Sequence, residues 1–381
     1  MGFSTRRLRR LAGVGVTTAA VTVGVAGCDP APPPWSSLEV VSTDASGPLP
    51  GDAIDLDLSA DGDTVAFHGF VTGSHPVDYV RDLTTGTLST PTWADSAGRP
   101  ILTPSPLRLS GDGDQVATFG CPQSPFGDTC SLMTGDVAGG TMTPRKSLPF
   151  ILNSNDYRVT PDLATVPWVP GNQPYSVHAN TGVDQDVVLT SPGSPELGDY
   201  FRTPAVSDDG SVVSFASEGD ATGQDVHLYD LEAGTLTTVT DGPGDNALVG
   251  GVTRDGLTVI VYGTLDGEPG LHAYDVASGT SELLLPELDA PIIEFGASAD
   301  GQRIVFTKGY DQSSGAIWML DRAAHSFVQL SVDGDNRPGN GPSYEPSISA
   351  DGRTVSFLSQ ATSLSPDDTH AAASAYVLTL P

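Results

Sequence analysis

The chain has 381 residues, of which 44 are glycine and 31 are proline, while aromatic residues make up only 7%. This composition suits short strands joined by many turns and argues against long helices, and no interior stretch approaches the length of a membrane span. The formal net charge is −30. Such a surface repels phosphate backbones and anionic lipid headgroups, so binding to nucleic acid is disfavoured.

Residues 1–27 are predicted to be a targeting segment, because residues 6–10 contain four arginines and a weakly apolar run follows from Leu11 to Ala26. The run ends in Val25-Ala26-Gly27-Cys28, which resembles the lipobox of bacterial lipoproteins. The resemblance implies cleavage before Cys28, lipidation of its sulfur, and a location on the extracytoplasmic face of the cell membrane, with membrane contact through the anchor alone. An ordinary secretory signal with an incidental cysteine is the alternative. The segment does not distinguish Sec from twin-arginine export.

Residues 28–37 are predicted to form the lipidated cysteine and a stiff linker, since Asp29–Pro34 contains four prolines. Removal of residues 1–27 leaves 13 basic against 47 acidic residues, a formal charge of −34. Many of the acidic residues are aspartates in turns, where the carboxylate caps nearby backbone N–H groups.

One short phrase, a polar residue two positions before an Asp-Gly turn, recurs along the rest of the chain and defines seven repeats. The turn aspartates are 45 to 51 residues apart: Asp61, Asp112, Asp162, Asp209, Asp255, Asp300 and Asp351. The glycine supplies the positive φ that a tight antiparallel hairpin needs. In repeat 3 the glycine is replaced by Leu163, and Pro167 falls in the following strand, so we expect a bulge or a shortened strand there.

Each repeat is predicted to contain four strands. The strand after the turn is apolar on both faces, as in Val259–Tyr262 and Ile304–Phe306, which is expected of a sheet packed between two neighbours. After the last turn there is room for two more strands, the second being Ala375–Leu380. We therefore predict that Leu38–Ser42 completes the last sheet, which removes exposed edges. A period of this length, built from short strands, indicates a closed β-propeller.

The repeat also resembles the TolB-like, WD-type propeller repeat: Ser-x-Asp-Gly, an apolar triplet, and an aromatic-rich strand that ends in aspartate. Asn340–Ser359 is an especially close match, and the resemblance covers residues 38–381. The resemblance implies an all-β β-propeller used for binding, and the seven repeats of this chain predict seven blades. It does not identify a ligand, since one fold serves many functions.

Cys121 and Cys130 flank a turn-rich loop and form an even pair once Cys28 is assigned to the lipobox. We predict a disulfide between them, which suits an oxidising compartment; two free thiols are the alternative.

No catalytic motif occurs in the chain, so no catalytic residue is assigned. His227 and His272 occupy the same position of the third strand as aromatic residues in other repeats, which favours packing over a ligand role. A catalytic site assembled from loops of several repeats leaves no local signature and remains an alternative.

Two acidic loops are candidate calcium sites, one with Asp333 and Asp335 and the other with Asp367 and Asp368. Neither loop alone supplies the spaced oxygen ligands of a known calcium cage. Turn capping by these carboxylates is the favoured interpretation.

The candidate ligand site lies at the start of the first strand of the repeats, where Asp55, Asp156, Glu294 and Glu345 occupy comparable positions. In a propeller these positions gather at the mouth of the central channel, rimmed by the loops His68–Val77, Cys121–Cys130 and Gln360–Ser374. Clustered carboxylates there would favour a cationic small ligand, a metal or a basic peptide segment. A solvated acidic funnel without a ligand is the alternative.

Together these features predict a non-catalytic binding or protein-interaction module at the cell envelope, with a protein, peptide or cationic partner. The alternative is a propeller enzyme, a lyase or hydrolase acting on a carbohydrate or peptide at the channel mouth. A third interpretation is an envelope spacer with no specific ligand.

Overall fold

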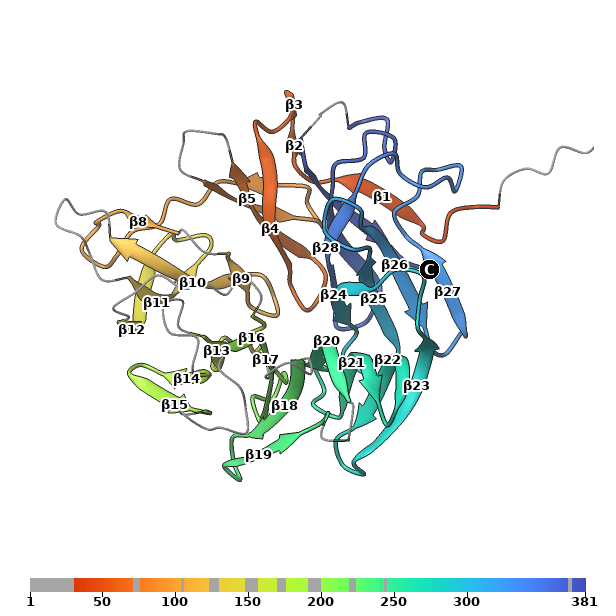
Figure 1. Cartoon of the computed structure of the whole chain (residues 1–381). Helices are drawn as coiled ribbons and strands as arrows, with labels where there is room; N and C mark the ends of the chain where they lie inside the picture. The colour runs from red at the N-terminus through yellow and green to blue at the C-terminus, as the bar shows by residue number, and fades with distance from the viewer. Residues whose placement is uncertain are drawn as a thin grey trace, which may run out of the picture. The chain divides into compact units, whose positions relative to one another are not determined.

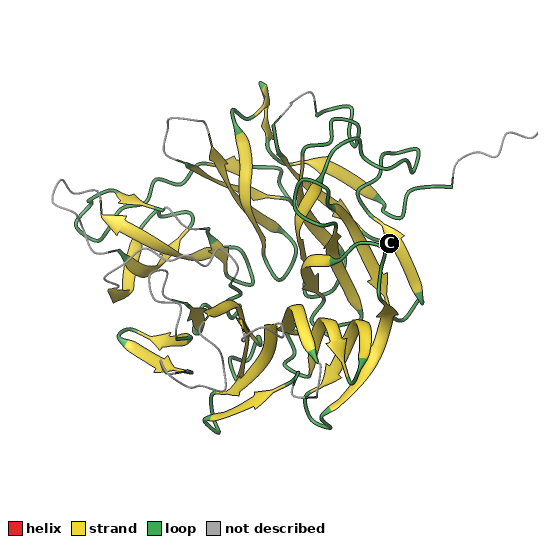
Figure 2. Ribbon diagram, in the orientation of Figure 1, coloured by secondary structure: helices red, strands yellow, loops and turns green. Residues whose placement is uncertain are grey.

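A computed structural model describes residues 31–70, 76–103, 106–122, 130–147, 157–169, 176–190, 200–218, 224–240, 242, 245–368 and 372–381. The chain divides into Met1–Ala31 and Pro32–Pro381, and the architecture below is that of the second unit. Every regular element in the described ranges is a strand (Figure 2). Within these ranges, no helix is long and apolar enough to span a membrane.

The first half of the unit forms separate antiparallel sheets, coloured red to green in Figure 1. Repeat 1 contributes β4 (Asp52–Leu58), β5 (Thr64–Phe70), β6 (Val77–Asp82) and β7 (Leu88–Ser89). The next sheet contains β8 (Ile101–Leu102), β9 (Arg108–Leu109), β10 (Gln115–Pro122), β11 (Ser131–Asp136) and β12 (Met142–Ser147). Repeat 3 contributes β13 (Val166–Trp168), β14 (His178–Gly182) and β15 (Gln185–Val188), and a small hairpin pairs β2 (Thr43–Asp44) with β3 (Gly47–Pro48).

Repeats 4 and 5 share one eight-stranded sheet, in which the pair Gln224–Ala247 joins two four-stranded halves. Its strands are β16 (Tyr200–Val206), β17 (Val212–Glu218), β18 (Gln224–Asp230), β19 (Thr235–Thr238), β20 (Asn246–Val252), β21 (Thr258–Leu265), β22 (Glu268–Asp275) and β23 (Thr280–Pro286). Repeat 6 follows with β24 (Ile292–Ala297), β25 (Arg303–Lys308), β26 (Ala316–Asp321) and β27 (Ser326–Gln329). The last sheet combines β28 (Ser343–Ile348), β29 (Thr354–Ser359) and β30 (Ser374–Thr379) with β1 (Ser37–Val40).

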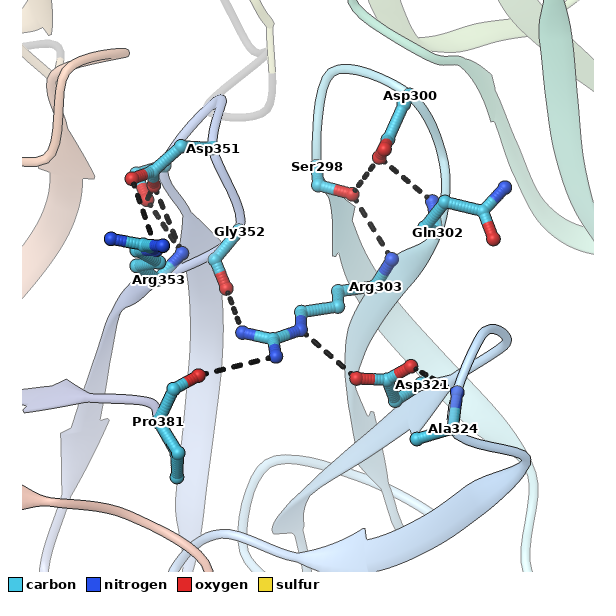
Figure 3. Close-up of polar contacts among 11 residues, drawn as sticks. Ser298, Asp300, Gln302, Arg303, Asp321, Ala324, Asp351, Gly352, Arg353 and Pro381 are labelled. Atoms are coloured by element: carbon cyan, nitrogen blue, oxygen red, sulfur yellow. Dashed lines mark hydrogen bonds and ion pairs between the residues drawn. The ribbon is translucent and has the colours of Figure 1, made fainter.

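The repeated phrase forms a self-capped turn, drawn for repeat 6 in Figure 3. The Asp300 carboxylate accepts hydrogen bonds from the Ser298 hydroxyl at 2.7 Å and the Gln302 N–H at 3.0 Å. The Ser298 hydroxyl in turn accepts one from the Arg303 N–H at 3.0 Å. Gly301 has φ +63°, so the predicted left-handed glycine is confirmed.

Repeat 3 departs from this pattern as its sequence predicts. Leu163 adopts φ +54° in place of the turn glycine. Strand β13, which contains Pro167, is only three residues long. The prediction of a shortened strand is therefore confirmed.

The apolar core lies between sheets, because the strands after the turns are buried on both faces. In the described ranges the buried residues form clusters, and each cluster joins two consecutive repeats. One of them packs Val65 and Phe67 of repeat 1 against Leu358 and Ala375 of repeat 7. The two ends of the repeat array are thus in direct contact.

The first and last strands of the unit pair with each other, as the sequence predicts. Strand β1 is antiparallel to β30, with Val40 opposite Tyr376, and the Val41 N–H donates to the Ala375 carbonyl at 2.8 Å. In Figure 1 the red β1 accordingly lies beside the blue strands of the last repeat.

Backbone hydrogen bonds also connect the turns of neighbouring repeats. The Ala299 N–H donates to the Ala350 carbonyl, and the Ala350 N–H donates to the Ala60 carbonyl. Arg303 adds a side-chain link, because its guanidinium donates to the carbonyl of Gly352, the carboxylate of Asp321 and the backbone oxygen of Pro381 (Figure 3). The turns therefore form a connected layer at one end of the first strands, here called the turn end.

Candidate functional site

The first strands of the repeats enclose a cavity of about 440 Å³. Residues from each of the seven repeats line it, among them Asp55, Arg108, Arg158, Ala205, Arg254, Glu294 and Glu345. When the repeats are aligned on their turn aspartates, the charged lining residues fall at three positions along the strands, here called levels. At the position six residues before the turn aspartate, the charged lining residues are carboxylates. At the position four residues before it, the lining side chains are charged or small. Arg254 stands one residue before its turn aspartate, at the turn end.

Asp55, Glu294 and Glu345 form what we call the carboxylate rim, at the end of the strands opposite the turns. The register of each of their strands shifts at this point, between Ile54 and Asp57, Ile292 and Glu294, and Tyr344 and Ser347. Asp55 and Glu345 also have positive φ, 56° and 53°. A bulge re-aims a side chain out of the ladder, which explains why these carboxylates reach the cavity.

Hydrogen bonds across neighbouring repeats hold the rim together. The Glu294 carboxylate accepts the Glu345 N–H at 2.8 Å, and the Glu345 carboxylate accepts the Leu56 N–H at 3.4 Å. The Gln312 side chain donates to Glu294 at 2.8 Å and to Glu345 at 3.5 Å. Part of the acidic charge thus serves to connect the repeats, and an exposed amide bridges the two glutamates.

A buried histidine supports the third member of the rim. His68 is 1% exposed, and its ring nitrogens lie 3.3 Å from Asp55 and 2.8 Å from Asp78. Asp78 also accepts hydrogen bonds from Trp93 and Thr103. Burial lowers the pKa of His68, but the hydrogen bonds and charges of Asp55 and Asp78 outweigh it and raise the pKa to about 9. His68 is therefore protonated at neutral pH and fixes the position of Asp55.

Three arginines, Arg108, Arg158 and Arg254, also line the cavity and form what we call the arginine wall. Arg108 and Arg158 stand four residues before their turn aspartates, the level that Asp57 occupies in repeat 1. Sequence reasoning missed all three. Alignment of the first strands on the turn aspartate would have placed Arg108 and Arg158 beside the predicted carboxylates.

The arginine wall is largely buried and partly engaged by the backbone. Arg158 donates to the carbonyls of Val206 and Val252, and burial and the nearby Arg254 lower its pKa to about 9. Arg254 lies 3.3 Å from the Asp208 carboxylate. The Arg108 guanidinium donates to the Tyr157 carbonyl at 2.8 Å and stands 5.0 Å from the centre of that ring.

The carboxylate of Asp57 also lines the cavity and interacts with the charges of the arginine wall. It accepts the Leu109 N–H at 2.8 Å. Burial raises its pKa, while Arg108, that N–H and Arg254 oppose the rise. The cavity therefore has an acidic sector on repeats 6, 7 and 1 and a basic sector on repeats 2, 3 and 5.

The structure brings Asp55, Glu294 and Glu345 to one cavity, whereas the fourth predicted residue, Asp156, lies outside the described residues, as does Cys28. Most of the predicted rim loop from Cys121 to Cys130 and part of the other two also lie outside. The disulfide between Cys121 and Cys130 is confirmed.

The candidate calcium residues have local partners. Asp333 accepts the N–H groups of Asp335 and Arg337, and Asp335 forms an ion pair with Arg337 at 2.5 Å. Asp368 accepts the Tyr376 hydroxyl at 2.5 Å, and the Asp367 N–H donates to Ser365. Among the described residues no group of three or more metal-ligating side chains is arranged to hold a metal ion. Calcium binding stays a prediction.

His227 and His272 lie in the core of their sheets. His227 is fully buried and hydrogen-bonds the hydroxyls of Ser217 at 2.8 Å and Thr238 at 3.0 Å. Burial lowers its pKa to about 4. His272 is 1% exposed and hydrogen-bonds the Glu268 carbonyl at 2.8 Å. Both therefore act as packed, neighbour-bonded side chains away from the cavity lining.

The fold has relatives among solved structures, and these define it as a β-propeller. A β-propeller domain of Cps50 (Swd1) from Myceliophteria thermophila matches with a TM-score of 0.55 and 10% identity, over 91% of this chain and all of that one. An oligogalacturonate lyase in complex with manganese matches with a TM-score of 0.61 and 16% identity, over 93% and 98%. Prolyl endopeptidases match with a TM-score of 0.56 and 16% identity, over 90% of this chain but 51% of theirs.

At these identities the likeness establishes the fold alone. No protein-family model matches the sequence, and no curated protein matches it.

Proposed function

We propose that this chain is a seven-bladed β-propeller, with the last blade closed by β1, that acts as a non-catalytic binding module. Support for the closed ring comes from the seven repeats, from core clusters that join consecutive repeats, and from the β1–β30 pairing. Support for the TolB-like, WD-type relationship comes from the repeat phrase itself. Closure leaves no unpaired sheet edge at the junction, which favours a long-lived scaffold around one central site.

The module is proposed to be a lipoprotein on the extracytoplasmic face of the cell membrane. Its parts are a signal peptide (1–27), the lipidated Cys28 with its linker (28–37) and the propeller (38–381). Support comes from the lipobox-like Val25–Cys28 and from the Cys121–Cys130 disulfide, a bond typical of oxidising compartments. Mass analysis of Cys28 from membranes tests the anchor, since an unmodified thiol contradicts it.

The binding role depends on one observation: residues that precede the turns of all seven repeats line a single cavity with a carboxylate rim. A site assembled from several elements, with a few converging polar groups in an otherwise largely apolar lining, is the usual form of a ligand pocket. The rim favours a cationic group, either on a small molecule or at the end of a protein or peptide partner.

The test is a pull-down from solubilised envelope with the anchored protein and with the double variant Glu294→Gln and Glu345→Gln. Loss of the two charges should reduce capture about tenfold or more, because each charge-assisted hydrogen bond contributes about 1.5–3 kcal/mol. The matched control is Glu232→Gln with Glu268→Gln, which removes the same charge from exposed positions away from the cavity. Equal capture by the wild type and both double variants would contradict the proposal.

A propeller enzyme is the second candidate, and Asp57 favours it. A buried carboxyl with a raised pKa beside Arg108 is the type of group that acts as a general acid or base. The fold relatives include a lyase and endopeptidases. Turnover of oligogalacturonate or of a proline-containing peptide, abolished by Asp57→Asn, would replace the binding proposal with a catalytic one.

A further inference from the structure

Opposite charges stand on different sectors of the central cavity. The carboxylate rim belongs to repeats 1, 6 and 7, whereas the arginine wall belongs to repeats 2, 3 and 5. Between them, at the level of Arg108 and Arg158, repeats 4 to 7 carry only small residues: Ala205, Gly251, Gly296 and Ser347. The small side chains leave room between the charged sectors, and the volume of about 440 Å³ lies in the range of small-ligand sites.

Two arginines of the wall, Arg158 and Arg254, have few side-chain partners among the described residues. Every hydrogen bond that Arg158 makes to the described residues goes to a backbone carbonyl. Arg254 hydrogen-bonds one carboxylate of the described residues, Asp208, at 3.3 Å, and that carboxylate is 29% exposed. The charge of Arg254 also acts on the carboxyl of Asp57. Burial lowers the pKa of Arg158, and the positive charge of Arg254 lowers it further, whereas the charges of Asp208 and Asp255 oppose this shift.

Two guanidinium groups that lie near each other and are largely removed from solvent are costly, and an anion that joins them offsets this cost. Each presents a planar fork of N–H donors that matches carboxylate or phosphate oxygens. The carbonyls of Val206 and Val252 hold Arg158 in place, so this donor set is ordered before any ligand arrives.

We propose that the arginine wall is an anion subsite, and that the cavity takes a dipolar ligand whose ammonium group faces the rim and whose oxyanion meets Arg158 and Arg254. The inference deepens the binding role proposed above and rests on it. A peptide with free termini and an amino-phosphate compound share this chemistry. The rim alone selects for positive charge, whereas the two sectors together select against ligands that carry one sign of charge only.

The first experiment measures affinity by calorimetry with two dipolar probes, trialanine with free termini and phosphoethanolamine. Single-charge forms, N-acetyl-trialanine, trialanine amide and ethanolamine, serve as comparisons. At least one dipolar probe should bind, and removal of either charge should weaken binding about tenfold or more, the equivalent of one lost charged hydrogen bond. If trialanine alone binds, the oxyanion is a carboxylate; if phosphoethanolamine alone binds, it is a phosphate. Failure of both dipolar probes, or equal binding of single-charge forms, overturns the inference.

The second experiment uses the variants Arg158→Gln and Arg254→Gln with the probe that binds best. Each should weaken that probe about tenfold or more while affinity for its ammonium-only form stays unchanged. Arg99→Gln is the control, since Arg99 is 69% exposed and pairs with Asp95 away from the cavity. Arg254→Gln keeps the test decisive if Arg158→Gln does not fold, because Arg254 donates to no carbonyl of the described residues.

The outcomes separate the two proposals. If the arginine variants bind every probe as the wild type does while the Glu294 and Glu345 variant loses its partner, the anion subsite is wrong and the binding role survives. If the glutamate variant also keeps full capture, both are wrong.

Discussion

The two ends of the first strands differ in how similar the repeats are to one another, although only a few residues separate the ends. At the turn end the repeats are alike: a serine or threonine, an aspartate and a residue with positive φ satisfy one another locally, as in Ser298, Asp300 and Gly301. At the other end the repeats differ, with a carboxylate in some and a small or apolar residue in others. Features that every repeat shares thus hold the fold, and features that single repeats carry are the candidates for function.

The largest expected effect is at the turn end. A Cβ at Gly113, which has φ +73°, would overlap the side chain of Thr64 in the preceding repeat. We expect Gly113→Ala to lower the free energy of unfolding by about 2–5 kcal/mol, from about 1–2 kcal/mol of left-handed strain and about 1–3 kcal/mol of overpacking. Urea unfolding measures the change.

Gly86→Ala is the matched control for that variant. Gly86 has φ +69°, but a Cβ there would meet open space. This variant should therefore lose only the strain, about 1–2 kcal/mol. Equal losses in the two variants would mean that the turns do not pack against neighbouring repeats as described.

A smaller effect, dependent on pH, is expected at the carboxylate end. The folded-state pKa of His68, about 9, lies above its unfolded value of 6.5, so its contribution is complete below pH 6.5 and is lost as the pH rises through 9. The shift corresponds to about 3 kcal/mol. Urea unfolding at pH 6 and pH 10 should give a loss of this order in the wild type that His68→Gln lacks.

His227 offers the opposite case in the same molecule. Its folded-state pKa of about 4 lies below the unfolded value, so it lowers stability as the pH falls from 6.5 to 4. His227→Gln should remove that slope and leave the alkaline loss intact. An NMR titration of the wild type that gave His68 a pKa below 7 would refute its clamped position between Asp55 and Asp78.

The smallest expected effect concerns the loop closed by Cys121 and Cys130. The disulfide closes a short loop of the chain and should therefore restrict the unfolded state. Cys121→Ser with Cys130→Ser should cost about 2–3 kcal/mol and lower the Tm, and a reducing agent should have the same effect on the wild type but none on the variant. A reducing agent that destabilised both equally would show that its effect lies elsewhere.

Much of the fold was predictable because it depends on local chemistry. An Asp-Gly pair needs a left-handed residue wherever it closes a hairpin, and even Leu163 is forced into that conformation by its neighbours. The pairing of the first strand with the last followed from a count of strands. The disulfide followed from two cysteines that flank one loop.

The charge pattern of the cavity was only half predictable. The rim carboxylates stood out because the acidic residues recur at one position. Arg108 and Arg158 also share a position, four residues before the turn aspartate, but Arg254 stands alone, one residue before it. Their contacts join distant parts of the chain, as when Arg158 donates to Val252. Side chains of that length reach across repeats, and a pattern read within one repeat does not reveal them.

The pairing of β1 with β30 also determines at which end of the last sheet β1 begins. Ser37 lies opposite Thr379, and the neighbouring Leu380 donates to the carbonyl of Arg353, directly after the last turn. Ser37 therefore lies at the turn end, opposite the carboxylate rim formed by Asp55, Glu294 and Glu345. If Cys28 is lipidated as proposed, the anchored linker would join the propeller at the turn end, and the carboxylate rim would lie at the opposite end of the first strands.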